Sequence, residues 1–266
     1  MNRTSPLNGP DVIAPQILRA IDVASRRTGT DFDYLLNQAR IESSFRPDAR
    51  AATSSAVGLY QFTNQTWLAT MKRHGAEHGY GWAADAVASN RRGVHHVADP
   101  AMREAILDLR SDPALAALMA GEHAADNRNH LVNALGREPE PVDLYLAHFL
   151  GASGAESFLK AWLENPSQPA ASLFREAAST NRAIFHDSGG RARSLDEIRR
   201  AFANKLARGG AASAHLAERS RSKDQMQIFT GQGALDLLPI EPMPQRLSID
   251  FALGAYRKLA GAGAGR

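Results

Sequence analysis

Two glutamates lie where a helical pattern calls for apolar residues. Between residues 31 and 45, apolar side chains recur at helical spacing at Phe32, Leu35, Leu36 and Ala39, and Glu42 is the next member of that face. A carboxyl group pointing toward a core or a cleft wall is desolvated, which raises its pKa. A raised pKa suits a general acid working near neutral pH. The alternative is that Glu42 reaches water from the helix end or pairs with a buried arginine.

Glu122 repeats the pattern. It follows Leu115, Leu118 and Met119 on the apolar face of a long predicted helix. Two inward carboxylates on different helices can flank one cleft, as in glycoside hydrolysis. The alternative is a structural ion pair with Arg128 or Arg103.

The elements that must position these side chains are predicted to be helices, because strand patterns are scarce and Ala, Leu, Arg and Glu dominate. Helix starts are indicated by Asp31, by Asp99 and Asp112 with a following proline, and by a capping box from Ser194 to Glu197. The expected helices cover about 15–27, 31–45, 113–135, 142–150, 155–164 and 170–178, with further ones starting near 64, 100 and 194. The predicted fold class is therefore mainly α.

Composition excludes several classes of protein. The 266 residues include no cysteine, which rules out disulfides, thiolate metal sites and a cysteine nucleophile. Lys and Arg number 31 against 28 Asp and Glu, a net charge of +3. This mild basicity fits an anionic polymer but does not indicate nucleic acid without a clustered basic patch. The basic stretch from Arg191 to Arg208, which includes Lys205, is interpreted as a solvated helix face, with contact to anionic peptidoglycan or a membrane surface as the alternative.

Three parts are expected along the chain. Residues 1–11 are predicted to be a flexible N-terminus, 12–210 a helical domain, and 211–266 a partly disordered tail rich in Ala, Gly, Ser and Pro. No apolar run long enough for a signal peptide or a transmembrane helix is expected, so the export route is open.

Residues 41–68, IESSFRPDARAATSSAVGLYQFTNQTWL, carry a resemblance to a known family. A Glu-Ser at a helix end, a proline and a small-residue loop precede Gly-Leu-Tyr-Gln, here Glu42-Ser43, Pro47 and Gly58 to Gln61. This order resembles lytic transglycosylases of the soluble SLT type, which are relatives of goose-type lysozyme, and most closely those of phage endolysins. A second block from Leu144 to Gly151 resembles the late Ala-Tyr-Asn-x-Gly element of that family. The resemblance covers about residues 12–165.

The resemblance implies a lysozyme-like helical fold, peptidoglycan as substrate and no cofactor. Glu42 would be the lone catalytic acid, protonating the β-1,4 bond between N-acetylmuramic acid and N-acetylglucosamine. The ionised Glu42 would then take a proton from the muramic C6 hydroxyl, which attacks C1 and closes a 1,6-anhydro sugar. Attack by water instead would make the protein a hydrolytic muramidase.

Substrate-binding roles follow from the same resemblance. Gly58, Leu59 and Gln61 would line the sugar groove. Ser54 or Ser55 would hydrogen-bond the N-acetyl group, or else satisfy the local backbone.

The sequence departs from the family at several of these positions. Tyr60 replaces a methionine, and its ring could stack on a sugar, while Ser55 replaces a glycine. His148 and Phe149 stand where the family has Tyr-Asn, so His148 is expected either to replace the lost donor or to leave the protein inactive. Tyr145 is expected to pack, with cleft contact as the alternative, and Glu122 is a secondary candidate for an auxiliary acid.

The remaining motifs predict no further chemistry. His74-Gly-Ala-Glu-His78 lacks the His-Glu-x-x-His order of zinc proteases, and Gly75 weakens a helix there, so no metal is expected. The domain is expected to act at the cell envelope, with the tail docking to an envelope machine. The alternative from another class is a non-catalytic protein that binds or assembles peptidoglycan.

Overall fold

The computed structural model describes residues 13–52 and 54–208, which are mostly helical. The helices and short strands are α1 (Pro15–Thr28), α2 (Phe32–Ser43), α3 (Asn64–His74), η1 (Gly75–His78), α4 (Gly81–Ala86), β1 (Ala88–Ser89), β2 (His95–His96), α5 (Pro100–Asp108), η2 (Leu109–Ser111), α6 (Pro113–Leu135), α7 (Pro141–Leu150), α8 (Ala152–Glu164), α9 (Ala170–Leu173), α10 (Arg175–Thr180) and α11 (Arg182–Phe185). A last helix is described over residues 195–208. The mainly α class is confirmed. The predictions of a flexible N-terminus at 1–11 and of a tail at 211–266 lie outside the described residues. The predicted helical domain at 12–210 is described from 13 to 208, apart from residue 53.

Helix starts follow the local chemistry that the sequence indicated. The carboxylates of Asp31, Asp99 and Asp112 each accept hydrogen bonds from backbone N–H groups in the first turn of α2, α5 and α6. Ser194 and Glu197 form the reciprocal capping box. The predicted helix over 170–178 is instead broken at Phe174, which separates α9 from α10.

The end of α2 differs from the prediction by two residues. Ser44 and Phe45 have positive φ angles of 53° and 62°, so the helix stops at Ser43 rather than continuing to Phe45. Their N–H groups close the helix end on the carbonyls of Arg40 and Ala39. Glu42 therefore sits in the last turn of α2, just before a sharp reversal of the chain.

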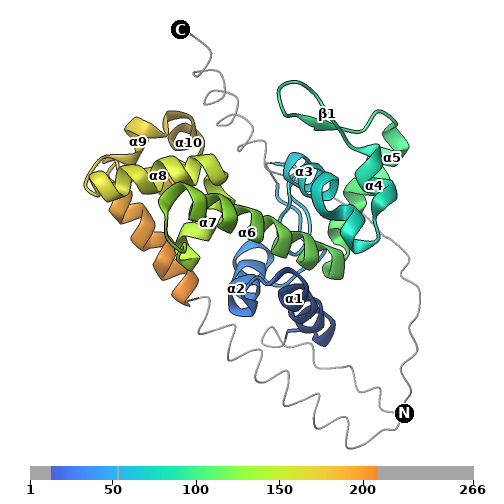
Figure 1. The fold of residues 1–266 in the computed structure, drawn as a ribbon. Helices are drawn as coiled ribbons and strands as arrows, with labels where there is room; N and C mark the ends of the chain where they lie inside the picture. The colour runs from blue at the N-terminus through green and yellow to red at the C-terminus, as the bar shows by residue number, and fades with distance from the viewer. Residues whose placement is uncertain (1–12, 53, 209–266) are drawn as a thin grey trace, which may run out of the picture.

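Buried apolar side chains form two clusters. The N-terminal cluster joins residues between Ile13 and Ala124, and the C-terminal cluster joins residues between Leu131 and Leu206. α6 contributes to both, and Figure 1 shows it running through the middle, with α1 and α2 below it, α3 to α5 above its right-hand part and α7 to α10 at its left. Leu144 on α7 packs against both clusters. The junction between them is therefore built from α2, α6 and α7.

Close packing sets α6 against α1. A Cβ on Gly121 would lie 2.4 Å from the Thr28 Oγ1, so only glycine allows this approach. The Thr30 hydroxyl donates to the Gly121 carbonyl over 2.8 Å. Within residues 13–52 and 54–208, no helix has the length and apolar character needed to cross a membrane.

Arg110 organises the loop between α2 and α3 from inside. Its guanidinium, in a side chain only 3% exposed, donates to the carbonyls of Leu107, Ser55 and Phe62 and to the Asn64 Oδ1 over 2.7–3.1 Å. Burial lowers the Arg110 pKa to about 10, which still leaves it charged at neutral pH. A buried cation is tolerated here because carbonyl oxygens surround it.

Gly58 lies against the backbone of Arg110. Its φ is +83°, and a Cβ would come within 2.0 Å of the Arg110 carbonyl oxygen. We expect Gly58→Ala to lower the free energy of unfolding by about 3 kcal/mol or more, because backbone strain and a backbone clash add up. Urea denaturation followed by circular dichroism measures the change.

Gly136→Ala is the matched control. Gly136 also has a positive φ, +69°, but no atom lies within 4 Å of its Cβ position. Only the backbone strain remains, about 1–2 kcal/mol. Equal losses in the two variants would show that the contact with Arg110 contributes nothing.

Candidate active site

Glu42 lies where the helical pattern placed it. Leu35, Leu36 and Ala39 on the same face of α2 are fully buried, and the Glu42 side chain is 18% exposed. The neighbouring Ser43 hydroxyl donates to the Leu59 carbonyl over 2.8 Å, which ties this helix end to the following loop. The carboxylate is thus mostly withdrawn from water but still reachable from outside.

Two side chains of α7 contact the Glu42 carboxylate. The Tyr145 hydroxyl donates to Oε1 over 3.3 Å, and the His148 Nε2 lies 3.4 Å from the same oxygen. They are three residues apart on α7, which places them on one helix face. The junction of the two clusters therefore brings together Glu42 from α2 with Tyr145 and His148 from α7.

Gln38 holds the other side of His148. Its Nε2 lies 3.1 Å from the His148 Nδ1, one helical turn before Glu42 on α2. The His148 Nε2 faces Glu42, and its proton, which the imidazolium and one neutral form of the ring both carry, can be donated to the carboxylate. His148 thus supplies a donor to Glu42, one of the two outcomes expected for this position.

Lys205, on the helix over 195–208, completes the group. Its Nζ donates to the Tyr145 hydroxyl over 2.9 Å and lies 5.3 Å from the centre of the Tyr145 ring. Lys205 is exposed, as predicted for a solvated helix face, but its amine also contacts Tyr145. Its position between Phe202 and Leu206, which are both buried, was the available indication in the sequence.

The pKa of Glu42 is shifted in the direction opposite to the prediction. Burial raises the Glu42 pKa, but the hydrogen bond and charge of His148, the charge of Lys205 and the Tyr145 hydroxyl together outweigh it and hold the pKa below its usual value. The expectation of a raised pKa was wrong because it counted desolvation alone. The resting carboxyl group is ionised at neutral pH.

Most residues expected to line the groove are buried instead. Leu59 and Tyr60 are at most 1% exposed, and Ser55 and Gln61 are below 10%. The ring of Tyr60 has no face for a sugar to stack on, so that expectation is corrected. Burial raises the pKa of its hydroxyl.

These buried residues hold the loop together. The Gln61 Nε2 donates to the carbonyls of Gly58 and Ala49, over 2.9 and 3.1 Å. The Ser55 Oγ accepts from the Asn64 N–H over 3.2 Å, which is the local-backbone alternative for this serine. Gly58 is required by its contact with Arg110 rather than by close approach to a ligand.

Ser54 and Phe149 are the remaining predicted contacts. Ser54 is partly exposed, so a role with the N-acetyl group stays a prediction. Phe149 is partly buried and packs edge-on against Phe202, with ring centres 5.3 Å apart. Phe149 therefore makes an apolar contact at a position where the family has a polar asparagine.

Glu122 belongs to a different group of side chains. Its Oε1 lies 2.7 Å from the His78 Nε2, and its Oε2 lies 3.6 Å from the His74 Nδ1. Arg128, suggested as an ion-pair partner, pairs with Glu138 instead. The two glutamates share an apolar-face pattern but have different partners, so the structure does not support a two-carboxylate cleft.

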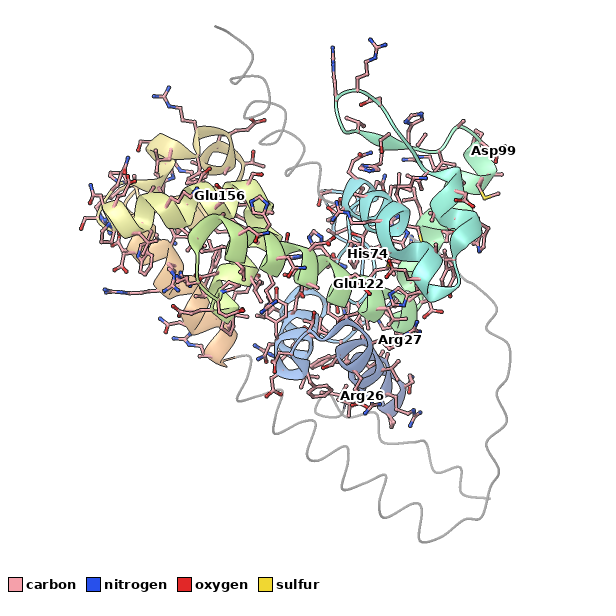
Figure 2. All side chains as sticks on the ribbon, viewed as in Figure 1. Arg26, Arg27, His74, Asp99, Glu122 and Glu156 are labelled. Atoms are coloured by element: carbon pink, nitrogen blue, oxygen red, sulfur yellow. The ribbon has the colours of Figure 1, made fainter. Side chains whose placement is uncertain are left out.

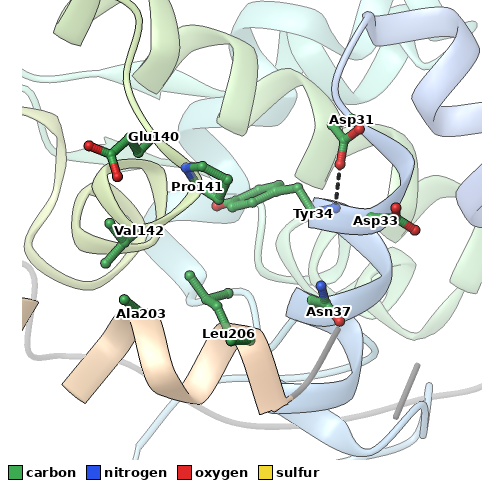
Figure 3. Close-up of a pocket in the computed structure, with 10 residues that line it drawn as sticks. Asp31, Asp33, Tyr34, Asn37, Glu140, Pro141, Val142, Ala203 and Leu206 are labelled. Carbon is green, nitrogen blue, oxygen red and sulfur yellow. Dashed lines mark hydrogen bonds between the residues drawn. The ribbon is translucent and has the colours of Figure 1, made fainter. Parts of the chain in front are cut away.

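A pocket of about 320 Å³ opens beside this region (Figure 3). Its lining comes from α2, from the start of α7 and from the helix over 195–208: Asp31, Asp33, Tyr34, Asn37, Glu140, Pro141, Val142, Ala203, Leu206 and Ala207. Neither Glu42 nor its partners Tyr145 and His148 line this pocket. It therefore shares supporting elements with the candidate site but is a separate concavity.

The described residues form a mainly helical fold of the lysozyme-like kind, with a partly buried glutamate at the junction of its two apolar clusters. Residues 19–99 match the family model described as the transglycosylase SLT domain. This segment is therefore similar to the soluble SLT-type transglycosylases, a family whose substrate is peptidoglycan. The match includes Glu42 and the loop to Gln61, whereas α7 and Lys205 lie beyond it. The likeness to phage endolysins stays a prediction.

Replacing His148 tests the charge balance. We expect His148→Phe to raise the Glu42 pKa, because it removes a hydrogen bond and a positive charge while burial remains. A group with a lowered folded-state pKa stabilises the fold above its unfolded pKa, and this contribution is lost as pH falls through the folded pKa. The variant should therefore lose less stability on acidification. Carboxyl ¹³C NMR titration, assigned with Glu42→Gln, measures the pKa, and an unchanged or lower value would contradict the account.

Proposed function

We propose that Glu42 is the general acid and then the general base of a lytic transglycosylase reaction. The observation that carries the proposal is a partly exposed carboxylate, on the helix that the SLT match includes, held by Tyr145 and His148. The substrate bond is the β-1,4 link between N-acetylmuramic acid and N-acetylglucosamine. The product is a 1,6-anhydromuramic end.

The steps balance with one carboxyl group. Protonated Glu42 gives its proton to the glycosidic oxygen, the bond from that oxygen to C1 breaks, and positive charge develops on the muramic ring. The Glu42 carboxylate then takes the proton of the C6 hydroxyl, whose oxygen bonds to C1. Closure within one sugar gains from being intramolecular.

The contacts of Glu42 favour the bond-breaking step. His148, Tyr145 and Lys205 stabilise the carboxylate, which is the form that Glu42 reaches as its proton leaves. The cost is that the resting group is mostly ionised at neutral pH, so the active protonated fraction grows as pH falls.

Tyr145 and His148 compensate for the Tyr-Asn pair of the family, which His148 and Phe149 replace in this sequence. The phenol hydroxyl expected at 148 is supplied instead by Tyr145, three residues earlier on the same face of α7. The His148 Nε2 adds a second polar contact to the same oxygen. This arrangement favours a working enzyme over the non-catalytic alternative, which would need no ordered partners around Glu42.

A hydrolytic muramidase remains the alternative on the same residues. The two reactions share the acid step and differ in whether water or the C6 hydroxyl reaches C1. The products distinguish them.

Glu42→Gln is expected to reduce cleavage at least about 100-fold, because the amide keeps the shape of the side chain but cannot donate the proton. Purified peptidoglycan is incubated with each protein, and the soluble products are identified by mass spectrometry. Anhydro-muropeptides indicate transglycosylation, and reducing-end muropeptides indicate hydrolysis.

Glu164→Gln, at the exposed end of α8, is the matched control and should cleave like the wild type. Circular dichroism checks that both variants are folded. Wild-type rates in Glu42→Gln would remove Glu42 from the mechanism.

The pH profile gives an independent test. The alkaline limb of kcat/KM reports the acid of the free enzyme. Lys205→Met removes a positive charge that lowers the Glu42 pKa, so the limb should move to higher pH. Lys160→Met, which removes an exposed partner of Glu156, should leave the limb in place. A limb that stays fixed or moves to lower pH in Lys205→Met would assign it to another group.

A further inference from the structure

A second group of titratable side chains lies between the end of α3, η1 and α6. His74, Glu77 and His78 come from the first two elements, and Glu122 and Asp126 come from one turn of α6. Figure 2 labels His74 and Glu122 close together, on neighbouring helices. This group shares no residue with the contacts of Glu42, so its role is independent of the proposed function.

His74 has a nitrogen that the fold leaves without a partner. Its Nε2 lies 3.0 Å from the Asp126 Oδ2, which places the ring proton on Nε2. The buried Nδ1 makes no hydrogen bond among the described residues. This lone pair faces the Glu122 Oε2 at 3.6 Å, too far for a hydrogen bond. Such a pair of atoms, withdrawn from water, is stabilised by a positive charge between them, which is either a proton on Nδ1 or a bound cation.

The other groups around Glu122 leave that oxygen free to bind. His78, whose side chain is 4% exposed, lies with its Nε2 2.7 Å from the Glu122 Oε1 and so orients the carboxylate. Arg73 pairs with Asp126 and fixes the carboxylate that holds His74. Such outer contacts are the arrangement found around the ligands of metal ions.

Glu77 lies close to the same two residues. One ligand atom each from His74, Glu77 and Glu122 lie within 4.8 Å of one another. Ligands about 2.0–2.2 Å from a tetrahedral zinc ion are roughly 3.4 Å apart, close to the 3.6 Å between the Nδ1 of His74 and the Oε2 of Glu122. A mixed set of imidazole and carboxylate suits zinc better than calcium or magnesium, which prefer oxygen ligands.

We propose that this group binds one Zn²⁺ through the His74 Nδ1, Glu77 and Glu122, with water as the fourth ligand. The motif from His74 to His78 did not indicate this site, because it lacks the His-Glu-x-x-His order and Gly75 weakens a helix there. α3 ends at His74 and η1 follows, while the decisive carboxylate comes from Glu122, far along the chain. The ion would link η1 to α6 and stabilise the N-terminal cluster.

Isothermal titration calorimetry of the full chain with zinc chloride, after treatment with EDTA, tests the proposal. The wild type is expected to bind one Zn²⁺ per chain and to show no heat of binding with Mg²⁺ at the same concentration. Glu77→Gln is expected to raise the zinc Kd at least tenfold, and Glu122→Gln should do the same. Glu77 is exposed, so its variant is expected to fold normally. Glu164→Gln is the matched control and should keep the wild-type Kd.

Thermal unfolding is a second readout. Zinc at about 100 times its Kd should raise the wild-type Tm by several degrees, and it should raise that of Glu77→Gln by clearly less. Absence of zinc binding by the wild type would overturn the proposal and indicate that a protonated His74 bridges Glu122 and Asp126. Binding that is unchanged in both Glu77→Gln and Glu122→Gln would also overturn it, by assigning the zinc to other histidines.

Discussion

A carboxylate that is mostly withdrawn from water at the junction of two apolar clusters costs free energy unless hydrogen bonds and opposite charge surround it. Glu42 on α2 meets this requirement through Tyr145 and His148 on α7, with Lys205 behind Tyr145. The contacts come from elements of the C-terminal cluster, so the way that cluster packs against α2 determines the state of Glu42. The packing contacts that join the two clusters are therefore also the contacts that form the candidate site.

The loop after α2 is held by a second polar interaction. Arg110 is buried and satisfied by carbonyls of that loop, and its own carbonyl presses against Gly58. Gln61 closes the same loop from within. The most recognisable part of the sequence, Gly58 to Gln61, therefore positions the end of α2 instead of presenting side chains to a sugar.

Glu42 and Glu122 show how tertiary surroundings separate two similar residues. Each continues an apolar helix face, and each lies against histidine. Beside Glu42, a tyrosine hydroxyl and a lysine complete the set, and these favour an ionised carboxyl group that can exchange a proton. Beside Glu122, the partners are His74, His78 and a nearby Glu77, a set suited to holding a cation.

The sequence by itself determined the helices, because caps such as Asp31 and Asp112 and the periodic apolar faces are local features. It also determined that Glu42 turns toward the interior, since the helical repeat fixes direction. Only the tertiary structure decided what surrounds each side chain. The lowered pKa of Glu42, the burial of Tyr60 and the place of Lys205 depend on residues far apart in the chain. Desolvation and charge act through space, and no local pattern in the sequence specifies which distant groups will meet.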